Sequence, residues 1–555
     1  MRVNGAEILI RTLIDHDVKT IFGYPGGAVL NIYDALYKHS EEINHIIVAH
    51  EQGAAHAADG YARATGKVGV CLATSGPGAT NLVTGIATAY MDSVPLVVIT
   101  GNVAKPLIGK DSFQEVDIVG ITMPITKHNF IVRDVNELQH TIRKAFRIAN
   151  EGRKGPVLID IPKDVTAEMA EYVKKEPQKL KESNDVDEEI LDQVANLINE
   201  SKQVFIYAGG GIISGDASEE LLALAEKINS PVGMTLMGLG GFPYKHPLFT
   251  GMIGMHGSRC SNICATQCDL LIAIGARFSD RVINNKNFIK NAKVIHLDID
   301  EAEINKNVRV DLGLVGNIKV ILERLLPKLK ENRNEQWMAK LQELKEADKC
   351  TCENKGELNP QIIVTQIKEA VKEQGIIVTD VGQHQMWTAQ YYGYDAPRTF
   401  LSSGGLGTMG FGMGAAIGAQ VGMPNKRVVL VTGDGSFGMN CNEMVTAVSQ
   451  NLPVIIVIMN NSVLGMVRQW QKLFYEERYS STTLNRKTDF VKLAEAYGAT
   501  AFRAYTAEEL QDCLGKAVDY NSPVLIDCVV DMDKKVFPMV APGAPISEIL
   551  LEKDL

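Results

Sequence analysis

Asp434 and Asn461 each follow a short apolar run, at the point where a parallel sheet would place a binding site. The run at 428–431 leads into Gly433-Asp434-Gly435-Ser436, and the run at 454–458 leads into Asn460-Asn461. A helix-like segment joins the runs, so the pattern predicts strand, glycine turn, helix and strand, with both side chains at carboxyl ends of neighbouring strands. Such oxygens suit Mg²⁺, which shares its coordination with phosphates, and the glycines and helix N-terminus favour a diphosphate. The simpler alternative is an ordinary strand-helix-strand turn without a metal.

Glu51 is the second candidate for chemistry. It follows the apolar run at 43–50 and opens an alanine-rich segment, EQGAAHAADGYARATG, which predicts a helix. Glu51 is therefore also expected at the carboxyl end of a strand, where a carboxylate can hold and exchange a proton. The alternative is a glutamate that only stabilises the helix N-terminus.

An internal repeat connects the two halves of this chemistry. Residues 68–100 and 428–458 both read strand, glycine turn, helix, proline, strand, and Thr74 is as far from Pro95 as Thr432 is from Pro453. The first copy has Gly76 where the second has Asp434. We therefore expect two related domains, of which only the second holds a metal-bound diphosphate.

Two charged stretches, at 174–189 and at about 328–356, divide the chain of 555 residues. Both fit solvated linkers or exposed helices. The three remaining segments alternate apolar runs with helical patterns, which predicts an α/β protein with three doubly wound parallel sheets. The expected domains are 1–170, 188–327 and 358–555.

The composition excludes several classes of function. Acidic residues outnumber basic ones, 66 to 56, which does not indicate nucleic-acid binding. The apolar runs are too short to span a bilayer, and the N-terminus predicts an amphipathic helix rather than a targeting peptide. We therefore expect a cytoplasmic protein.

Three of the nine cysteines, Cys260, Cys264 and Cys268, recur every four residues on one stripe of a predicted helix. A metal site is conceivable, but buried small apolar side chains explain the stripe more simply.

Motifs across the whole chain resemble the catalytic subunit of acetohydroxyacid synthase (acetolactate synthase), a thiamine-diphosphate-dependent family. The stretch from Gly433 to Asn461 resembles that family's diphosphate anchor. The other matching motifs are GYPGGA (23–28), AHEQGAAHAADGYAR (49–63), DSFQE (111–115), IPKDV (161–165), GMHG (254–257), VGQHQMW (381–387), SGGLGTMGFGMGAAIGA (403–419), NNSVLGMVRQWQ (460–471) and FPMVAPGA (537–544). One departure is Gly414, where the family usually has proline.

The resemblance implies thiamine diphosphate and Mg²⁺ as cofactors. Asp434 and Asn461 would bind the metal, and Glu51 would hydrogen-bond the aminopyrimidine ring. Met409 would hold the cofactor in its bent conformation, and Gly407 would accept a hydrogen bond from its amine. Further cofactor contacts are expected from Val381, Gln383, His384, Gly433, Gly435, Ser436 and Met466.

The resemblance also implies FAD without a net redox role, bound by the central domain. That domain begins with an apolar run and three glycines, a turn that suits a dinucleotide diphosphate but is weak evidence alone. The alternative is a Rossmann-like domain that binds nothing. The expected contacts are Arg153, Gly209, Gly210, Gly211, Met255, His256, Gly275, Arg277, Arg281 and Asp298.

The implied reaction decarboxylates pyruvate and transfers the hydroxyethyl unit to a second pyruvate or to 2-oxobutyrate, in branched-chain amino-acid biosynthesis. Gly27 and Gln114 would face the reacting carbon, and Lys163 would lie at the substrate channel. Arg281 would bind the second acid, and Trp470 would select its side chain.

The family's sites lie between chains, so we expect a homodimer or homotetramer, with a small regulatory subunit as a further candidate partner. The alternative is a catabolic, flavin-free acetolactate synthase or another thiamine-dependent 2-oxo acid decarboxylase or carboligase.

Overall fold

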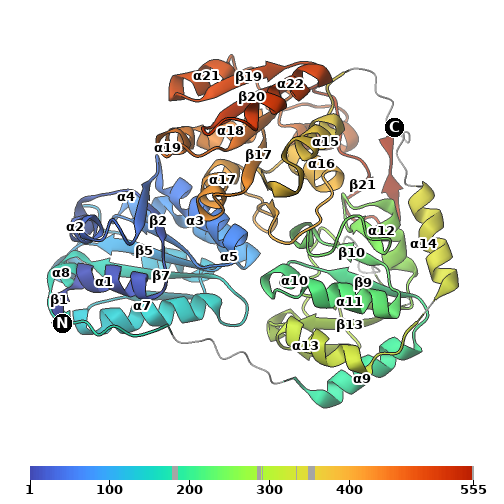
Figure 1. Cartoon of the computed structure of the whole chain (residues 1–555), viewed down its shortest axis with the longest axis horizontal. Coiled ribbons are helices and arrows are strands. Elements are labelled where there is room, and N and C mark those ends of the chain that lie inside the picture. Colours follow the sequence, from blue (N-terminus) through green and yellow to red (C-terminus); the bar gives the residue numbers. More distant parts are fainter. Residues whose placement is uncertain (178–185, 284–288, 290–291, 333, 348–356, 553–555) are drawn as a thin grey trace.

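The computed structural model describes residues 1–177, 186–283, 289, 292–332, 334–347 and 357–552. Three six-stranded sheets dominate it, and each is flanked by helices (Figure 1). Every ladder within these sheets is parallel. The predicted α/β fold with three parallel sheets is confirmed.

The N-terminal sheet contains, in spatial order, β3 (Asn44–Ile47), β2 (Thr20–Gly23), β4 (Gly69–Ala73), β5 (Leu96–Asn102), β7 (Pro156–Pro162) and β6 (His128–Ile131). Its helices are α1 (Gly5–Asp15), α2 (Leu30–Lys38), α3 (Glu51–Thr65), α4 (Pro77–Asn81), α5 (Val83–Asp92), α6 (Ile118–Thr122), α7 (Val135–Asn150) and α8 (Lys163–Ala167). A short ribbon pairs β1 (Arg2–Asn4) with β8 (Met169–Glu171). The predicted N-terminal amphipathic helix is α1, which Asn4 caps by accepting from the N–H of Glu7.

The central sheet has the order β11 (Phe249–Met252), β10 (Val232–Met234), β9 (Val204–Ala208), β12 (Leu270–Ile274), β13 (Lys293–Asp298) and β14 (Leu312–Val315). Its helices are α9 (Glu188–Glu200), α10 (Gly211–Ser214), α11 (Ser218–Ile228), α12 (Arg259–Gln267), α13 (Ile318–Leu325) and α14 (Glu335–Ala347). The three striped cysteines lie on or next to α12 and are buried, as predicted.

The second charged stretch contains α14, which is only partly exposed. Its Trp337 is buried and donates its indole N–H to the carbonyl of Val204, at 3.0 Å. The charged residues occupy the other face of α14, as in an amphipathic helix. The first charged stretch contains residues 178–185, which lie outside the described residues. The domain boundaries remain a prediction.

The C-terminal sheet has the order β16 (Phe400–Leu401), β15 (Gly375–Thr379), β17 (Arg427–Gly433), β18 (Ile455–Asn460), β20 (Val524–Val529) and β19 (Thr500–Ala504). Its helices are α15 (Pro360–Val371), α16 (Gln383–Tyr391), α17 (Phe411–Gly422), α18 (Asp434–Asn440), α19 (Met444–Ser449), α20 (Gly465–Phe474), α21 (Phe490–Tyr497) and α22 (Ala507–Ala517). A final two-stranded ribbon pairs β21 (Met539–Val540) with β22 (Ile549–Leu550).

The predicted repeat is visible in the strand orders. The N-terminal and C-terminal sheets have the same spatial order when strands are matched by their sequence of appearance, so β4 corresponds to β17 and β5 to β18. By the same correspondence, α3 and α17 are equivalent helices, because each leads into the equivalent strand.

These equivalent helices pack directly against each other and join the two repeats (Figure 1). Small residues allow the contact: a Cβ on Gly60 would collide with the backbone of Ala415, and one on Gly418 with the carbonyl of Ala57. A Cβ on Gly414 would lie 2.8 Å from that of His56. The glycine that replaces the family's usual proline therefore lies within this close helix contact.

Among the described residues, we find no helix with the length and apolar character needed to cross a membrane.

Candidate active site

The structure brings Asp434 and Asn461 together at the carboxyl edge of the C-terminal sheet. Asp434 is the first residue of α18, directly after β17, and Asn461 directly follows β18. Both are buried, with 6% and 8% of their surface exposed. Burial raises the pKa of the Asp434 carboxyl to about 6, while hydrogen bonds from the peptide N–H groups of Asn461 and Gly435 oppose this shift. The oxygens of the pair are suited to Mg²⁺.

His384 lies beside this pair and has an unsatisfied ring nitrogen. It belongs to the first turn of α16, and its ring fills the space left by two glycines: a Cβ on Gly433 would lie 2.9 Å from its Nδ1, and one on Gly382 3.0 Å from its Cε1. Burial lowers the pKa of His384 to about 3, so the imidazole is neutral. Its Nε2 is buried and has no hydrogen-bond partner among the residues that the structure describes. Because such atoms are rare in native proteins, Nε2 fits a group that a diphosphate oxygen would complete.

Met409 and the glycine turn form the next part of this edge. A Cβ on Gly435 would lie 3.9 Å from the Cε of Met409, so the Met409 side chain reaches the turn that begins α18. Gly407 has a φ of +68°, and a Cβ there would meet nothing closer than 4.0 Å. The Ser436 hydroxyl donates to the carbonyl of Val381 at 2.8 Å. These expected cofactor contacts therefore lie around one turn.

Gln383 connects the metal pair to α20. Its Oε1 accepts from the Asn461 amide at 3.3 Å, and its Nε2 donates to Gln469 at 3.1 Å. Met466 and Trp470 lie on the same helix and are partly exposed, with the Trp470 ring edge-on to Phe474 at 5.8 Å between centroids. Hydrogen bonds through Gln383 and Gln469 thus connect the expected metal ligand Asn461 to α20, the helix that carries the expected substrate residue Trp470.

Glu51 is the first residue of α3 and is buried, with 9% of its surface exposed. The amide of Asn81 donates to its Oε2 at 2.9 Å. Its Oε1 lies over Gly78, where a Cβ would approach it to 3.2 Å. One carboxylate oxygen is therefore fixed by the protein, and the other faces a position without a side chain.

Gly27, Gln114 and Lys163 lie at the carboxyl edge of the same N-terminal sheet as Glu51. Gly27 follows β2 and has open space at its Cβ position, and Lys163 follows β7 and is exposed. Gln114 is exposed with a φ of +58°, and its backbone contacts Gly76, whose Cβ would lie 2.8 Å from the Gln114 carbonyl oxygen. The glycine turn of the first repeat thus supports the loop that presents Gln114.

The glycine turn of the central domain has a structural explanation. Gly209, Gly210 and Gly211 follow β9, and Gly275 follows β12 with a φ of +55°. A Cβ on Gly211 would lie 2.5 Å from the Cα of Gly275, and one on Gly209 would collide with the Gly275 carbonyl. The two loops meet backbone to backbone, so their packing requires these glycines with or without a bound nucleotide.

The other expected flavin contacts follow or end strands of the central sheet, but they differ in burial and in hydrogen bonding. Burial lowers the pKa of His256 to about 4, and within the described part of the chain its buried Nδ1 has no partner. The N–H of Met255 donates to the carbonyl of Arg281 at 2.7 Å, and the Arg281 side chain is 64% exposed. The carbonyl of Arg277 accepts from Asn307, and the carboxylate of Asp298 accepts from a peptide N–H of its own turn.

Arg153 forms ion pairs between the N-terminal and central units. Its Nη1 lies 2.7 Å from Glu303 and 3.2 Å from Asp300, and its Nε donates to Ser93 at 2.8 Å. In this arrangement, the guanidinium serves a domain contact.

Three functional candidates, Arg63, Asp92 and Glu443, were not identified from the sequence. All are charged residues whose side chains are almost completely buried between the N-terminal and C-terminal units. Asp92 and Glu443 lie close to the glycine turns in sequence, but no local pattern separates them from surface acids.

Models of the thiamine pyrophosphate enzyme family match all three units of this chain. The N-terminal TPP binding domain matches residues 3–121, the central domain matches 191–325, and the C-terminal TPP binding domain matches 380–528.

Curated relatives match the chain over nearly its whole length. The probable acetolactate synthase large subunit of Methanocaldococcus jannaschii is 48% identical, over 99% of this chain and 95% of that protein. The acetolactate synthase large subunit of Cyanidium caldarium is 45% identical over 98% and 96%, and that of Haemophilus influenzae is 44% identical over 100% and 99%. With identities at this level along the full sequence, and with the strand-end residues arranged as described, the chain belongs to the acetolactate synthase large-subunit family of thiamine pyrophosphate enzymes.

Proposed function

We propose that this protein is the catalytic subunit of an acetolactate synthase, which decarboxylates pyruvate and joins the remaining two-carbon unit to a second 2-oxo acid. The observation that carries this proposal is the carboxyl edge of the C-terminal sheet. There Asp434 and Asn461 lie side by side, and the His384 ring packs against Gly433 of the same turn and carries a buried nitrogen, Nε2, without a partner among the described residues.

These residues fit a magnesium-bound diphosphate. Asp434 and Asn461 would supply oxygen ligands to Mg²⁺, the neutral His384 would donate one hydrogen bond from Nε2 to a diphosphate oxygen, and the N-terminus of α18 would favour negative charge. When bound, thiamine diphosphate supplies a nucleophilic carbon that adds to 2-oxo acids and accepts the electrons released on loss of CO₂.

Glu51 would hold the proton that activates the cofactor. Asn81 fixes its Oε2, so its Oε1 remains for a ring nitrogen of the aminopyrimidine. A hydrogen bond between Glu51 Oε1 and that ring nitrogen would provide the path along which a proton passes between the carboxyl group and the ring. Met409, beside Gly435, would restrict the cofactor to its bent shape.

Substrate recognition would use groups around these edges. Gln114 and Gly27 would face the reacting carbon, and Lys163 would lie along the approach. Arg281 would bind the carboxylate of the second acid through its planar fork of donors. Trp470 would distinguish ethyl from methyl groups, for which an apolar pocket offers about 1–3 kcal/mol per methylene.

FAD in the central domain is part of the same proposal. The unpartnered Nδ1 of His256 and the strand-end positions of Gly275, Arg277 and Asp298 support it. The ion pairs of Arg153 and the backbone contact of the glycine turn are satisfied within the protein and add no support.

We also propose that each site forms between two chains. Within one chain, the segment before Glu51 contacts Glu443, whereas Asp434 begins α18, which ends at Asn440, before Glu443. This separation supports a site that combines Glu51 of one chain with Asp434 of another, in a homodimer or homotetramer. The relatives named large subunit support a small regulatory partner. A cytoplasmic location remains a proposal from composition.

One assay tests the function. Purified protein is incubated with pyruvate, thiamine diphosphate, Mg²⁺ and FAD, each cofactor is omitted in turn, and the product is analysed for acetolactate. We expect acetolactate and CO₂ with all three cofactors, and loss of product without thiamine diphosphate or Mg²⁺. A complete mixture that releases CO₂ without acetolactate would instead favour the decarboxylase alternative.

The FAD omission addresses the other alternative. Full activity of a flavin-free, colourless protein that does not turn yellow with added FAD would favour a catabolic, flavin-free enzyme on the same scaffold.

A further inference from the structure

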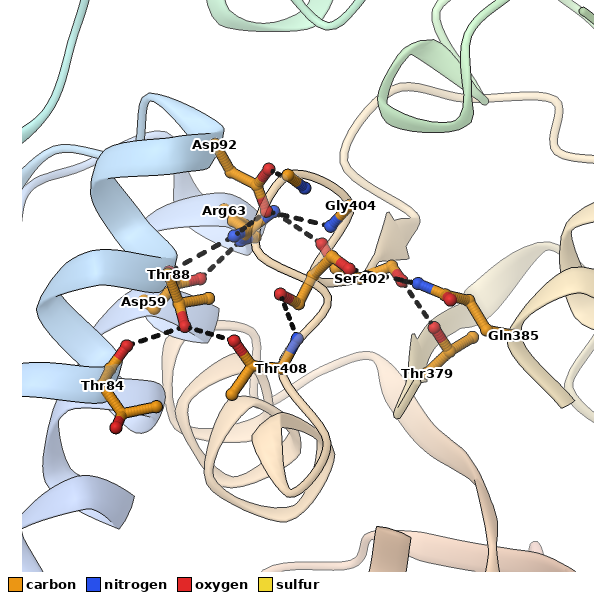
Figure 2. Close-up of polar contacts among 12 residues, drawn as sticks. Asp59, Arg63, Thr84, Thr88, Asp92, Thr379, Gln385, Ser402, Gly404 and Thr408 are labelled. Carbon is orange, nitrogen blue, oxygen red and sulfur yellow. Dashed lines mark hydrogen bonds and ion pairs between the residues drawn. The ribbon is translucent and has the colours of Figure 1, made fainter. Parts of the chain in front are cut away.

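Asp92 binds two successive peptide groups of the opposite repeat. It is the last residue of α5, its side chain is fully buried, and its two oxygens accept from the N–H groups of Gly405 at 2.7 Å and Gly404 at 3.1 Å. Figure 2 shows this contact from the N-terminal domain to the loop that precedes α17. The loop continues directly into Gly407 and Met409, the expected cofactor contacts.

Arg63 holds the Asp92 carboxylate in place. Its Nη2 donates to Asp92 at 2.9 Å and its Nη1 to the carbonyl of Ser402 at 2.8 Å, while its Nε is paired with Asp59 on the same helix (Figure 2). Burial disfavours the charge of Arg63, but the two aspartates raise its pKa above the ordinary range. The network therefore keeps Arg63 charged and holds the Asp92 side chain in place.

Threonine hydroxyls continue the same connection. The hydroxyls of Thr88 and Thr408 lie 2.7 Å apart across the domain boundary, and the N–H of Thr408 donates to Ser403 at 3.0 Å (Figure 2). Thr408 lies between Gly407 and Met409 in sequence, so this contact fixes the loop at the cofactor positions themselves.

Glu443 makes the reverse contact. It belongs to the C-terminal repeat, directly before α19, and is completely buried. Its oxygens accept from the N–H groups of His50 at 3.0 Å and Ala49 at 3.2 Å, and from the Thr446 hydroxyl at 2.7 Å. His50 directly precedes Glu51, so this carboxylate fixes the backbone that presents the expected proton carrier.

The two contacts are reciprocal in the repeat. The helices α5 and α19 occupy equivalent places after the two glycine turns, and α3 and α17 are the equivalent helices that pack together. In each direction, an acid binds two successive N–H groups in the segment that leads into the helix of the other repeat, although Asp92 ends α5 and Glu443 directly precedes α19. Carboxylates accept such bonds more strongly than neutral groups do.

We propose that Asp92 and Glu443 are positioning residues of a reciprocal clamp, in which each repeat sets the cofactor-facing segment of the other. Asp92, with Arg63, sets the loop that carries Gly407 and Met409, and Glu443 sets Glu51. This inference rests on the proposed function. If sites form between chains, the clamp of one chain connects parts of two different sites.

The Asp92 half is tested by Asp92→Asn. The carboxamide would turn its NH₂ group toward one of the two peptide N–H groups, so the loop must shift. We expect the Kd of thiamine diphosphate, measured by calorimetry with saturating Mg²⁺, to rise roughly tenfold or more.

Asp15→Asn is the matched control. Asp15 has a side chain that is only 3% exposed and is bonded to Arg143 and to the Tyr172 hydroxyl, all within the N-terminal domain. This variant should lose thermal stability while binding thiamine diphosphate as the unaltered protein does.

The Glu443 half is tested by Glu443→Gln, with a different readout. We expect thiamine diphosphate to bind nearly normally, because the diphosphate residues are untouched. The exchange of the cofactor's C2 proton with deuterium, followed by NMR after acid quench, should slow roughly tenfold or more, because the proton carrier is displaced.

If either variant does not fold, Thr408→Val and Thr446→Val replace them, since each removes one link of the same clamp. Their effects should be smaller and in the same direction. Normal affinity with Asp92→Asn or Thr408→Val, together with normal exchange with Glu443→Gln or Thr446→Val, would overturn the clamp. Failure of the unaltered protein to bind thiamine diphosphate would instead overturn the proposed function.

Discussion

At the residue scale, the ring nitrogen Nε2 of His384 points to a ligand contact. It is buried without a partner among the described residues, and its ring packs against Gly433, whereas the Glu51 and Asn461 side chains at the two edges have protein partners. Desolvating a polar atom without a hydrogen bond costs about 1–3 kcal/mol. A hydrogen bond to a bound diphosphate would remove that cost, so the same atom would strengthen cofactor binding.

His384→Asn tests this interpretation. Asparagine keeps a polar amide at this position, while Nε2 is lost. We expect thiamine diphosphate to bind roughly tenfold more weakly or worse, because a hydrogen bond to a charged group contributes about 1.5–3 kcal/mol. The measurement is the rise in thermal midpoint on adding the cofactor with Mg²⁺, which should shrink.

The midpoint of the cofactor-free His384→Asn protein is the internal control, because it reports only the cavity that the smaller side chain leaves. An unchanged cofactor-induced rise would show that Nε2 does not contact the diphosphate.

At the scale of elements, the contact between α3 and α17 is decided by small residues. The two equivalent helices, α3 and α17, pack so closely that a side chain larger than hydrogen does not fit at Gly60 or Gly418. This contact brings Asp92 and Glu443 within reach of the opposite loops.

Gly418→Ala should destabilise the protein strongly. The added Cβ would collide with the carbonyl of Ala57 on the facing helix, and overpacking of this kind typically costs about 1–3 kcal/mol. Thermal unfolding measures the loss.

Gly515→Ala is the matched substitution on α22. No atom lies within 4 Å of its Cβ position, so alanine should raise stability by about 0.5–1 kcal/mol through helix propensity alone. Equal effects of the two substitutions would contradict a close contact between α3 and α17.

The helix pair α1 and α7 gives a pH prediction. His16 ends α1 and stacks on Phe146 of α7 at 4.4 Å between ring centroids. Burial lowers the pKa of His16 to about 4, from an ordinary 6.5. The unfolded chain therefore binds a proton that the folded one rejects, so this residue reduces stability as the pH falls from about 6.5 to about 4.

His16→Leu should remove that part of the pH dependence. The difference in unfolding midpoint between His16→Leu and the unaltered protein should grow in favour of the variant between pH 7 and pH 4.5. A constant difference over that range would mean that His16 titrates normally in the fold.

At the scale of the whole molecule, the proposed function divides the site between two chains. Within one chain, Glu51 lies next to the Glu443 contact, whereas Asp434 begins α18, which ends before Glu443.

Mixing Glu51→Ala and Asp434→Ala proteins tests this arrangement. Neither variant should make acetolactate alone. Mixed and reassembled chains should recover part of the activity, because some interfaces would combine an intact Glu51 with an intact Asp434. As a control, each variant alone, taken through the same reassembly, should remain inactive. A mixture that also remains inactive would mean that Glu51 and Asp434 of the same chain form one site.

Much of the architecture was predictable from the sequence because its causes are local. Apolar runs, glycine turns and proline positions predicted the parallel sheets and the repeat, since strand periodicity and turn chemistry act over a few residues. The positions of Asp434, Asn461 and Glu51 were predictable for the same reason, because the first two directly follow strands and Glu51 lies in the turn region after β3. The roles of residues such as Arg281 and Trp470 depended on the family resemblance.

The sequence by itself therefore determined the fold class, the family, and the positions of Asp434, Asn461 and Glu51 near strand ends. Only the tertiary structure decided which charged residues are buried between the repeats. Asp92 follows an ordinary helical pattern, and its partners Gly404 and Gly405 lie more than half the chain away. A carboxylate is held inside a protein by donors that another element supplies, and those donors become neighbours only when α3 packs against α17.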